Sequence, residues 1–231
     1  MSNRHAIVTQ AAAQYGDGMD SSHVIVLPGG GYTMLSDNEA EVVAERLRSF
    51  GLSASVFDYP VQTRHPGPLD AVRSEVRRVR AAGAARVALL GFSAGGHLAG
   101  QAALAPSGEP AERVDAAVLG YPVVSMELAT HRGSQDELLV PDAGNALRAS
   151  TSLDRLVTAD APPFFIWHTA ADEAVPVEHA YRLAQALAAH RVPHALHVFE
   201  EGEHGLGLAD GQGAAGQWSR LASEWLQARG W

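Results

Sequence analysis

Short, continuously apolar runs alternate with amphipathic stretches along this chain, and the alternation limits the possible folds more than any other feature. Unbroken apolar runs are typical of strands covered on both faces, whereas apolar residues three and four apart indicate helices. The strands are expected at residues 23–27, 54–59, 86–90, 116–121, 164–168 and 195–200. Repeated strand–helix units with short connections predict an α/β fold, with a mostly parallel sheet and helices on both faces.

The stretches between the expected strands carry helix signals. Apolar residues recur at helical spacing within residues 69–79 and 177–187, and residues 217–229 are interpreted as a closing helix. Ser36 and Glu39, three residues apart, have the pattern of a capping box. This pattern predicts a helix that opens there and runs to about residue 50.

Residues 125–161 interrupt the alternation of strands and helices. This segment is longer than a usual loop and only weakly periodic, so we interpret it as an excursion over the functional site, a small lid. The 231 residues suffice for one domain with a sizeable core, and no internal repeat or low-complexity linker divides them. We therefore expect residues 1–231 to form a single domain.

Charge and residue types exclude several classes of function. The formal net charge is −9, and an acidic chain does not attract nucleic acid or anionic membranes nonspecifically. The absence of cysteine removes disulfides, thiolate metal sites and cysteine nucleophiles. No run is long enough for a transmembrane helix, and residues 1–16 lack the apolar core of a signal peptide. We expect a cytoplasmic protein without nucleic-acid or membrane partners.

The sequence GFSAG, residues 91–95, lies between an expected strand and a helix of small residues. This is the G-x-S-x-G pattern in the context that a nucleophile requires. A strand that reverses sharply into a helix exposes the central side chain at the helix N-terminus, where partial positive charge gathers. The pattern predicts Ser93 as a nucleophile; the alternative is a tight structural turn with a surface serine.

A serine nucleophile needs a histidine base and a carboxylate that orients the base. In folds of this kind they follow the serine in the order acid, then histidine, each after a strand. Asp172 follows the expected strand 164–168, and His204 follows the strand 195–200. We predict Asp172 as the orienting acid and His204 as the base, with the adjacent Glu173 as an alternative acid.

Other histidines need separate explanations. His190, His194 and His197 are close together in the sequence, but His194 and His197 should point to opposite faces of one strand. No acidic or thiol ligand accompanies them at a plausible spacing, so we expect no metal site. His97 is expected to pack beneath the sheet, and His168 could be buried.

Several segments together resemble the α/β-hydrolase superfamily, and within it the bifunctional feruloyl and acetyl-xylan esterase-like branch, near the hormone-sensitive-lipase-like esterases. The segments cover residues 23–231 in the expected order and are LPGGGY, ERLRSFGLSASVFDY, RVALLGFSAGGHLAG, AVLGYPVVS, HRGS, PPFFIWHTAADEAVP and HVFEEGEHGLGL. The resemblance implies hydrolysis of carboxylic esters, often acetyl groups on sugars, without a cofactor. It implies Ser93, Asp172 and His204 as the catalytic residues, in agreement with the spacing.

The glycine turn after the first expected strand offers bare backbone N–H groups. A phosphate loop of the P-loop type is excluded, because the chain contains no lysine. We expect the turn to form half of an oxyanion hole, and Ala94 N–H the other half. By resemblance to three-glycine esterases, Gly30 and Gly31 are favoured as donors over Gly29.

Two further residues are candidate substrate contacts. Tyr32 follows the glycine turn, and His131 lies in the excursion, where it could equally be an ordinary surface residue. The segment 125–161 is poor in aromatic residues, which argues against a deep acyl tunnel.

The sequence therefore predicts a serine carboxylesterase for short acyl groups, such as acetyl esters of sugars or xylo-oligosaccharides. The alternatives are a serine amidase or peptidase, or an aryl-formamidase, on the same fold. A non-catalytic binding module is a third alternative.

Overall fold

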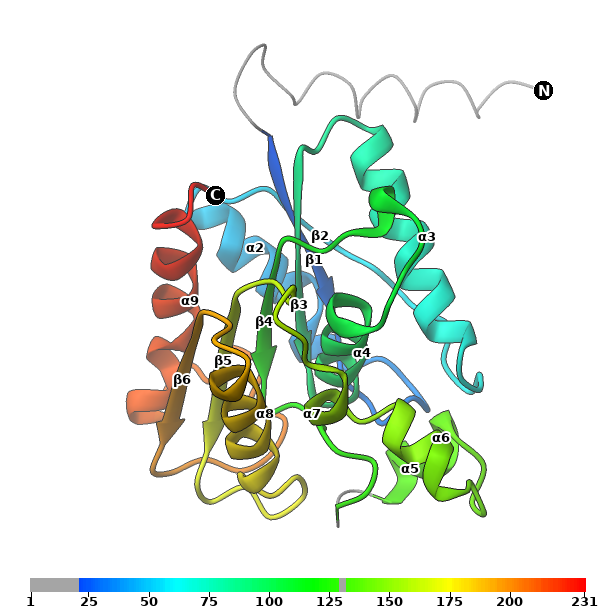
Figure 1. Cartoon of the computed structure of the whole chain (residues 1–231). Coiled ribbons are helices and arrows are strands. Elements are labelled where there is room, and N and C mark those ends of the chain that lie inside the picture. The colour runs from blue at the N-terminus through cyan, green and yellow to red at the C-terminus, as the bar shows by residue number, and fades with distance from the viewer. Residues whose placement is uncertain (1–20, 129–131) are drawn as a thin grey trace, which may run out of the picture.

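The computed structural model describes residues 21–128 and 132–231, and its centre is a sheet in which every neighbouring pair of strands is parallel (Figure 1). The strand order is β2-β1-β3-β4-β5-β6. The bounds are β1 Ser22–Leu27, β2 Ala54–Val56, β3 Arg86–Phe92, β4 Ala116–Gly120, β5 Phe164–Thr169 and β6 His194–Phe199. The parallel α/β sheet predicted from the apolar runs is confirmed.

Helices cover both faces of the sheet, and the alternation of side chains along β1 shows why. Ile25 and Leu27 pack on the face covered by α3, α4 and α8, whereas Val24 and Val26 pack on the face covered by α2 and α9. A strand covered in this way, as β1, β3, β4 and β5 are, must be apolar on both sides. The helices are α2 Glu41–Ser49, α3 Gly67–Ala81, α4 Ser93–Leu104, α5 Arg132–Leu138, α6 Asn145–Ser150, α7 Leu153–Leu156, α8 Glu178–Ala189 and α9 Trp218–Gln227.

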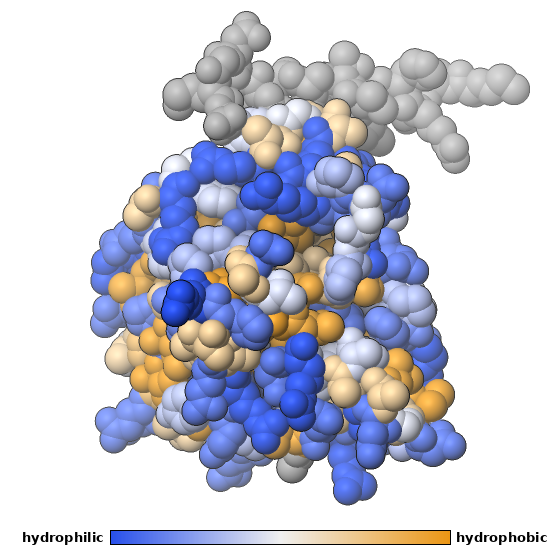
Figure 2. Space-filling view, in the orientation of Figure 1, coloured by the Kyte–Doolittle hydropathy of each residue, from blue (hydrophilic) through white to orange (hydrophobic). Residues whose placement is uncertain are grey.

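The polar exterior agrees with this arrangement. Figure 2 shows hydrophilic residues over most of the face seen in Figure 1, interrupting its apolar patches. Within residues 21–128 and 132–231, no helix has the length and apolar character needed to cross a membrane.

The second expected strand, residues 54–59, is shorter than predicted. β2 ends at Val56, and the chain then turns so that the Tyr59 hydroxyl donates to the Pro28 carbonyl at 2.7 Å. Apolar residues continue beyond Val56 because they pack on the core, and not because they extend the strand.

The capping box predicted at Ser36 and Glu39 does not form. Ser36 makes no side-chain capping hydrogen bond, and the segment splits into a short 3₁₀ helix, η2 Asp37–Glu39, and α2. The Glu39 carboxylate instead turns into the protein and accepts hydrogen bonds from Gly29 and Tyr121. Glu39 therefore bonds to residues distant in the sequence, and not to the backbone of Ser36 as a capping box requires.

The excursion at residues 125–161 carries the short helices α5, α6 and α7, of which α5 and α6 lie at the lower right in Figure 1. α7 packs against α4, where a methyl group on Gly100 would overlap the Leu153 side chain. Its backbone is tied to the core by Leu153 N–H, which donates to the Val124 carbonyl at 2.8 Å. The role of the segment as a lid, and the single domain, stay predictions.

The two ends of the described chain lie at the amino ends of the strands. Ser22, at the start of β1, is paired with Arg86 at the start of β3. The Arg86 guanidinium lies 4.8 Å from the centroid of the Trp231 ring and donates to the Arg229 carbonyl at 2.8 Å. Figure 1 places the C-terminus at this end of the sheet.

Candidate active site

Ser93 lies at a sharp turn, where β3 runs directly into α4. Its φ of 50° is a conformation that residues with a side chain rarely adopt. The flanking glycines allow the turn, since a methyl group on Gly91 would overlap the Gly95 carbonyl, and one on Gly95 the Leu27 carbonyl. The turn expected from G-x-S-x-G is therefore present, with the Ser93 side chain at the N-terminus of a helix.

The side chains of Ser93, His204 and Asp172 form a continuous hydrogen-bonded series. His204 Nε2 lies 2.8 Å from Ser93 Oγ, and His204 Nδ1 lies 2.7 Å from Asp172 Oδ2. Asp172 Oδ1 accepts hydrogen bonds from the N–H groups of Ala174 and Val175, each at 2.9 Å. The three residues follow β3, β5 and β6, so parallel strands deliver them to one edge of the sheet.

The carboxylate of Asp172 is buried but ionised at neutral pH. Burial alone would raise its pKa, but hydrogen bonds from His204 and Val175 outweigh burial and hold the pKa below its ordinary value. The alternative acid, Glu173, is exposed. An ionised Asp172 favours the tautomer with the proton on His204 Nδ1, which leaves Nε2 able to accept the Ser93 proton.

Sequence reasoning missed the part that two residues play beside this series: Tyr121, which contacts His204, and Glu39, which bonds to Tyr121. The ring of Tyr121, which follows β4, lies edge-on to the His204 ring with centroids 5.0 Å apart. Its hydroxyl donates to Glu39 Oε1 at 2.6 Å and accepts the Gly207 N–H at 2.8 Å. Burial raises the pKa of Tyr121 well above its ordinary value, so the hydroxyl stays neutral. Its place directly after a strand was the available signal.

The glycine turn faces Ser93 across a small cavity of about 290 Å³. Gly30 and Gly31 line this cavity with Ser93 and His204, and they have φ values of 120° and 65°. A methyl group on Gly30 would overlap the Met34 carbonyl. The turn therefore depends on glycine at a position where its backbone borders the cavity.

The predicted substrate contact at Tyr32 is wrong. The Tyr32 side chain is fully buried, and its hydroxyl lies 2.7 Å from His97 Nδ1. Because the Thr151 carbonyl can only accept, His97 Nε2 donates to it at 2.7 Å, and Nδ1 accepts from Tyr32. His97 therefore packs and bonds beneath the site, as expected. His131, the other predicted contact, lies outside the described residues.

Other histidines make ordinary packing and hydrogen-bonding contacts. His197 stacks on Phe165 with ring centroids 4.9 Å apart, and His194 Nδ1 lies 2.9 Å from the Val192 carbonyl. Across the part of the chain that the structure describes, no three metal-ligating side chains are grouped to hold an ion.

Two fully buried histidines make stability sensitive to acid. Burial lowers the pKa values of His97 and His168 to about 4. The unfolded chain, with histidine pKa values near 6.5, takes up these protons first, so stability is complete above about pH 6.5 and falls toward pH 4. We expect the free energy of unfolding to fall by about 2 kcal/mol per histidine between pH 7.5 and 5. Urea titrations at both pH values measure this fall in the free energy of unfolding. In His97→Gln the fall should be smaller by about 2 kcal/mol, the contribution of one histidine. Equal stabilities of the wild type at the two pH values would contradict the prediction.

The sheet topology and the site together define an α/β-hydrolase. A model of the prolyl oligopeptidase family matches residues 70–229, more than half of the chain. The chain therefore belongs to this family. The expected α/β-hydrolase fold and the likeness to the acetyl-xylan esterase-like branch are confirmed.

Individual relatives are hydrolases by name. The chain is 32% identical to an endo-1,4-beta-xylanase B of Butyrivibrio fibrisolvens over 225 residues, which is 89% of this chain and 35% of that protein. It therefore spans about a third of the length of this curated relative.

Similar solved structures are esterases and related hydrolases. An acetyl ester-xyloside bifunctional hydrolase from Caldicellulosiruptor lactoaceticus has a TM-score of 0.87 and 37% identity, with 94% of this chain and 86% of that chain covered. A carboxylesterase from Lactobacillus plantarum WCFS1 has a TM-score of 0.79 and 28% identity, with 94% and 89% covered. Esterase 2 of Thermogutta terrifontis, phosphonylated by sarin, has a TM-score of 0.80 and 25% identity, with 94% and 87% covered.

Proposed function

We propose that this protein is a serine carboxylesterase that cleaves short acyl esters through an acyl-enzyme. The observation that carries the proposal is the position of His204, between Ser93 Oγ at 2.8 Å and Asp172 Oδ2 at 2.7 Å. A base within hydrogen-bond reach of a hydroxyl, itself oriented by a carboxylate, is the arrangement that activates a serine.

In the first step, His204 Nε2 takes the Ser93 proton while Oγ forms a bond to the ester carbonyl carbon. Asp172 stabilises the resulting imidazolium. His204 then returns the proton to the alcohol oxygen as the carbon–oxygen bond breaks, which leaves an acyl group on Ser93. In the second step, water gives a proton to His204 and attacks this acyl group, and the proton passes back to Ser93 Oγ as the carboxylic acid leaves.

The negative oxygen of each tetrahedral intermediate needs donors on the opposite side from His204. Gly29 N–H already donates to Glu39 Oε2 at 2.7 Å, so it is not available. We assign the oxyanion hole to the N–H groups of Gly30, Gly31 and Ala94. This assignment rests on the glycine conformations and on the start of α4 at Ser93.

The cavity beside Ser93 suits a small acyl group. Its volume is about 290 Å³, and Met34, Ser134 and Ala174 contribute to its lining. The relatives named as a xylanase and as an acetyl ester-xyloside hydrolase favour acetyl esters of sugars or xylo-oligosaccharides as substrates.

Substrate preference gives the direct test. We expect kcat/KM for p-nitrophenyl acetate to exceed that for the octanoate by about tenfold or more, because the cavity of about 290 Å³ must hold the acyl group together with part of the alcohol group. Acetylated xylo-oligosaccharides should release acetate, and methyl ferulate and p-nitroacetanilide run beside them test the aromatic ester and the amide. Faster cleavage of the octanoate, or of the amide, would overturn the assignment in favour of a lipase-like esterase or an amidase.

A further inference from the structure

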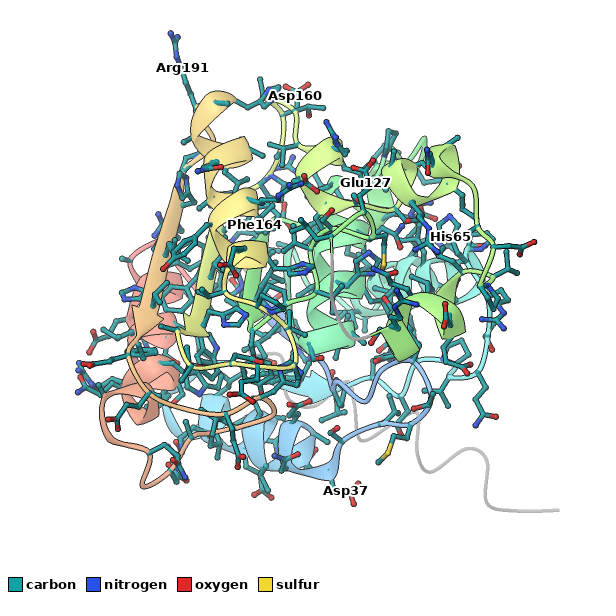
Figure 3. All side chains as sticks on the ribbon, turned by 90° about the horizontal axis from the view of Figure 1, so that it is seen from below. Asp37, His65, Glu127, Asp160, Phe164 and Arg191 are labelled. Atoms are coloured by element: carbon teal, nitrogen blue, oxygen red, sulfur yellow. The ribbon has the colours of Figure 1, made fainter. Side chains whose placement is uncertain are left out.

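Glu39 is a buried carboxylate with no role in the mechanism above. Its exposed fraction is 2%, although both preceding residues, Asp37 and Asn38, are exposed. Figure 3 views the molecule from below and shows Asp37 pointing outward from the blue segment that carries η2. Burial of a carboxylate is costly unless its oxygens are paired, so the contacts of Glu39 should explain its position.

One side of Glu39 holds the glycine turn. Oε2 accepts the Gly29 N–H at 2.7 Å, and the Ser36 N–H donates to the Gly29 carbonyl at 3.1 Å. A methyl group on Gly29 would lie 2.6 Å from Glu39 Oε2 and 3.1 Å from Ser93 Cβ. Gly29 is therefore packed between Glu39 and the proposed nucleophile, and both of its backbone groups are fixed by residues 36–39.

The other side of Glu39 holds the loop that carries His204. Oε1 accepts the hydroxyl of Tyr121, which in turn accepts the Gly207 N–H and packs against the His204 ring. Asn38 Nδ2 donates to the Gly205 carbonyl at 2.9 Å, on the same loop.

Because Gly29 and Tyr121 both donate, the pattern is satisfied by an ionised carboxylate that accepts on each oxygen. Burial raises the pKa of Glu39, and the hydrogen bonds from Tyr121 and Gly29, with the charge of a protonated His204, oppose that rise. The titratable groups that face Glu39 are Tyr121, Tyr59 and His204; those that face His204 are Asp172, Glu39, Tyr121 and His168.

We propose that Glu39 is a positioning residue that ties the oxyanion turn to the His204 loop and supplies a second negative charge near the imidazolium. Glu39 also lines the cavity beside Ser93, but we propose that it acts through its hydrogen bonds to Gly29 and Tyr121. This inference rests on the proposed function, since it assigns Glu39 to the geometry of that site. Misplacing catalytic groups by about 1 Å can cost about 10²-fold in rate. The rate gained by fixing the oxyanion donors relative to His204 can therefore offset the cost of burying the Glu39 carboxylate.

Glu39→Gln tests the link with almost no change in shape. Gly29 N–H and the Tyr121 hydroxyl both donate to Glu39, so the NH₂ group of the new amide must face one of these two donors. The substitution also removes the negative charge. We expect kcat for p-nitrophenyl acetate to fall by about 10²-fold with little change in KM. The acidic limb of kcat/KM should move to lower pH, because the charge that favours protonated His204 is gone. Asp37→Asn, an exposed neutralisation in the same turn, is the matched control and should leave both quantities unchanged.

Tyr121→Phe provides a second variant that keeps the ring against His204 and deletes only the bridging hydroxyl. It should also lower kcat, and the double variant should lose less than the sum of the two single losses, because both act on one link. Active-site titration with a fluorophosphonate and thermal unfolding measure the folded, competent fraction of each variant. If Glu39→Gln fails to fold, Tyr121→Phe decides the question.

The inference is overturned if the folded variants keep kcat and the pH profile of the wild type to within about twofold, or lose rate only in proportion to the competent fraction. The Ser93→Ala variant separates the two proposals. An inactive Ser93→Ala with a fully active Glu39→Gln leaves the esterase mechanism standing and removes the role of Glu39, whereas an active Ser93→Ala removes the mechanism itself.

Discussion

Ser93→Ala is expected to reduce hydrolysis of p-nitrophenyl acetate by at least about 10³-fold without unfolding the chain. The change deletes only the Oγ atom, which lies 2.8 Å from His204 Nε2, and the Cβ atom remains in the turn. Without Oγ no acyl-enzyme can form, and only binding and oxyanion stabilisation of a water attack remain.

The rate is measured beside labelling by a fluorophosphonate probe, which should mark the wild type on the peptide that contains Ser93 and leave the variant unmarked. Ser49→Ala, on the exposed side of α2, is the control and should keep both rate and labelling. Activity of Ser93→Ala near that of the wild type would refute the assignment, and absence of labelling in the wild type would favour a non-catalytic binding module.

Asp172→Asn is expected to lower kcat by about 10⁴-fold while leaving the shape of the site unchanged. In the wild type, the Ala174 and Val175 N–H groups donate to Asp172 Oδ1. In the variant, they should donate to the oxygen of the new amide. The amide NH₂ would then face His204 Nδ1, so Nδ1 must be without a proton. The His204 proton moves to Nε2, and that atom can no longer accept the Ser93 proton.

Steady-state kinetics at saturating p-nitrophenyl acetate measure this loss. Glu173→Gln is the matched control, since Glu173 is the adjacent carboxylate and is exposed. Its kcat should match the wild type. A large loss in Glu173→Gln together with an active Asp172→Asn would exchange the two assignments.

Strands β1, β3, β4 and β5 could be predicted because they are buried almost throughout on both faces, which makes each of them a nearly unbroken apolar run. Asp172 was predicted from its place after the buried strand β5, and His204 from its place after β6, which is only half-buried and contains His194 and His197. The error at Ser36 and Glu39 has a different origin. Ser36 and Glu39 have the spacing of a capping box, but the hydrogen-bond partners of Glu39 are Gly29 and Tyr121, 10 and 82 residues away. Local spacing cannot reveal contacts of that kind.

Tyr32 illustrates a second limit of sequence reasoning. It directly follows glycines that border the cavity, but its φ of 63° accompanies a side chain directed to His97 in the interior. Proximity along the chain places a backbone near a site, whereas the dihedral angles decide where the side chain goes. Tyr121 shows the converse: the residue follows a strand, as Asp172 and His204 do, but its contacts depend on a hydroxyl that reaches two other loops.

The positions of Ser22 and Trp231 have a consequence for modular assembly. Ser22 and Trp231 lie at the amino ends of the strands, whereas Ser93, Asp172 and His204 follow the carboxyl ends. A second module joined at Trp231 would lie at the amino ends of the strands, on the opposite edge of the sheet from the cavity, and would not block access to it. If that module bound a polysaccharide, the tether would raise the local concentration of ester groups at the cavity, with no change to any residue of the hydrolase.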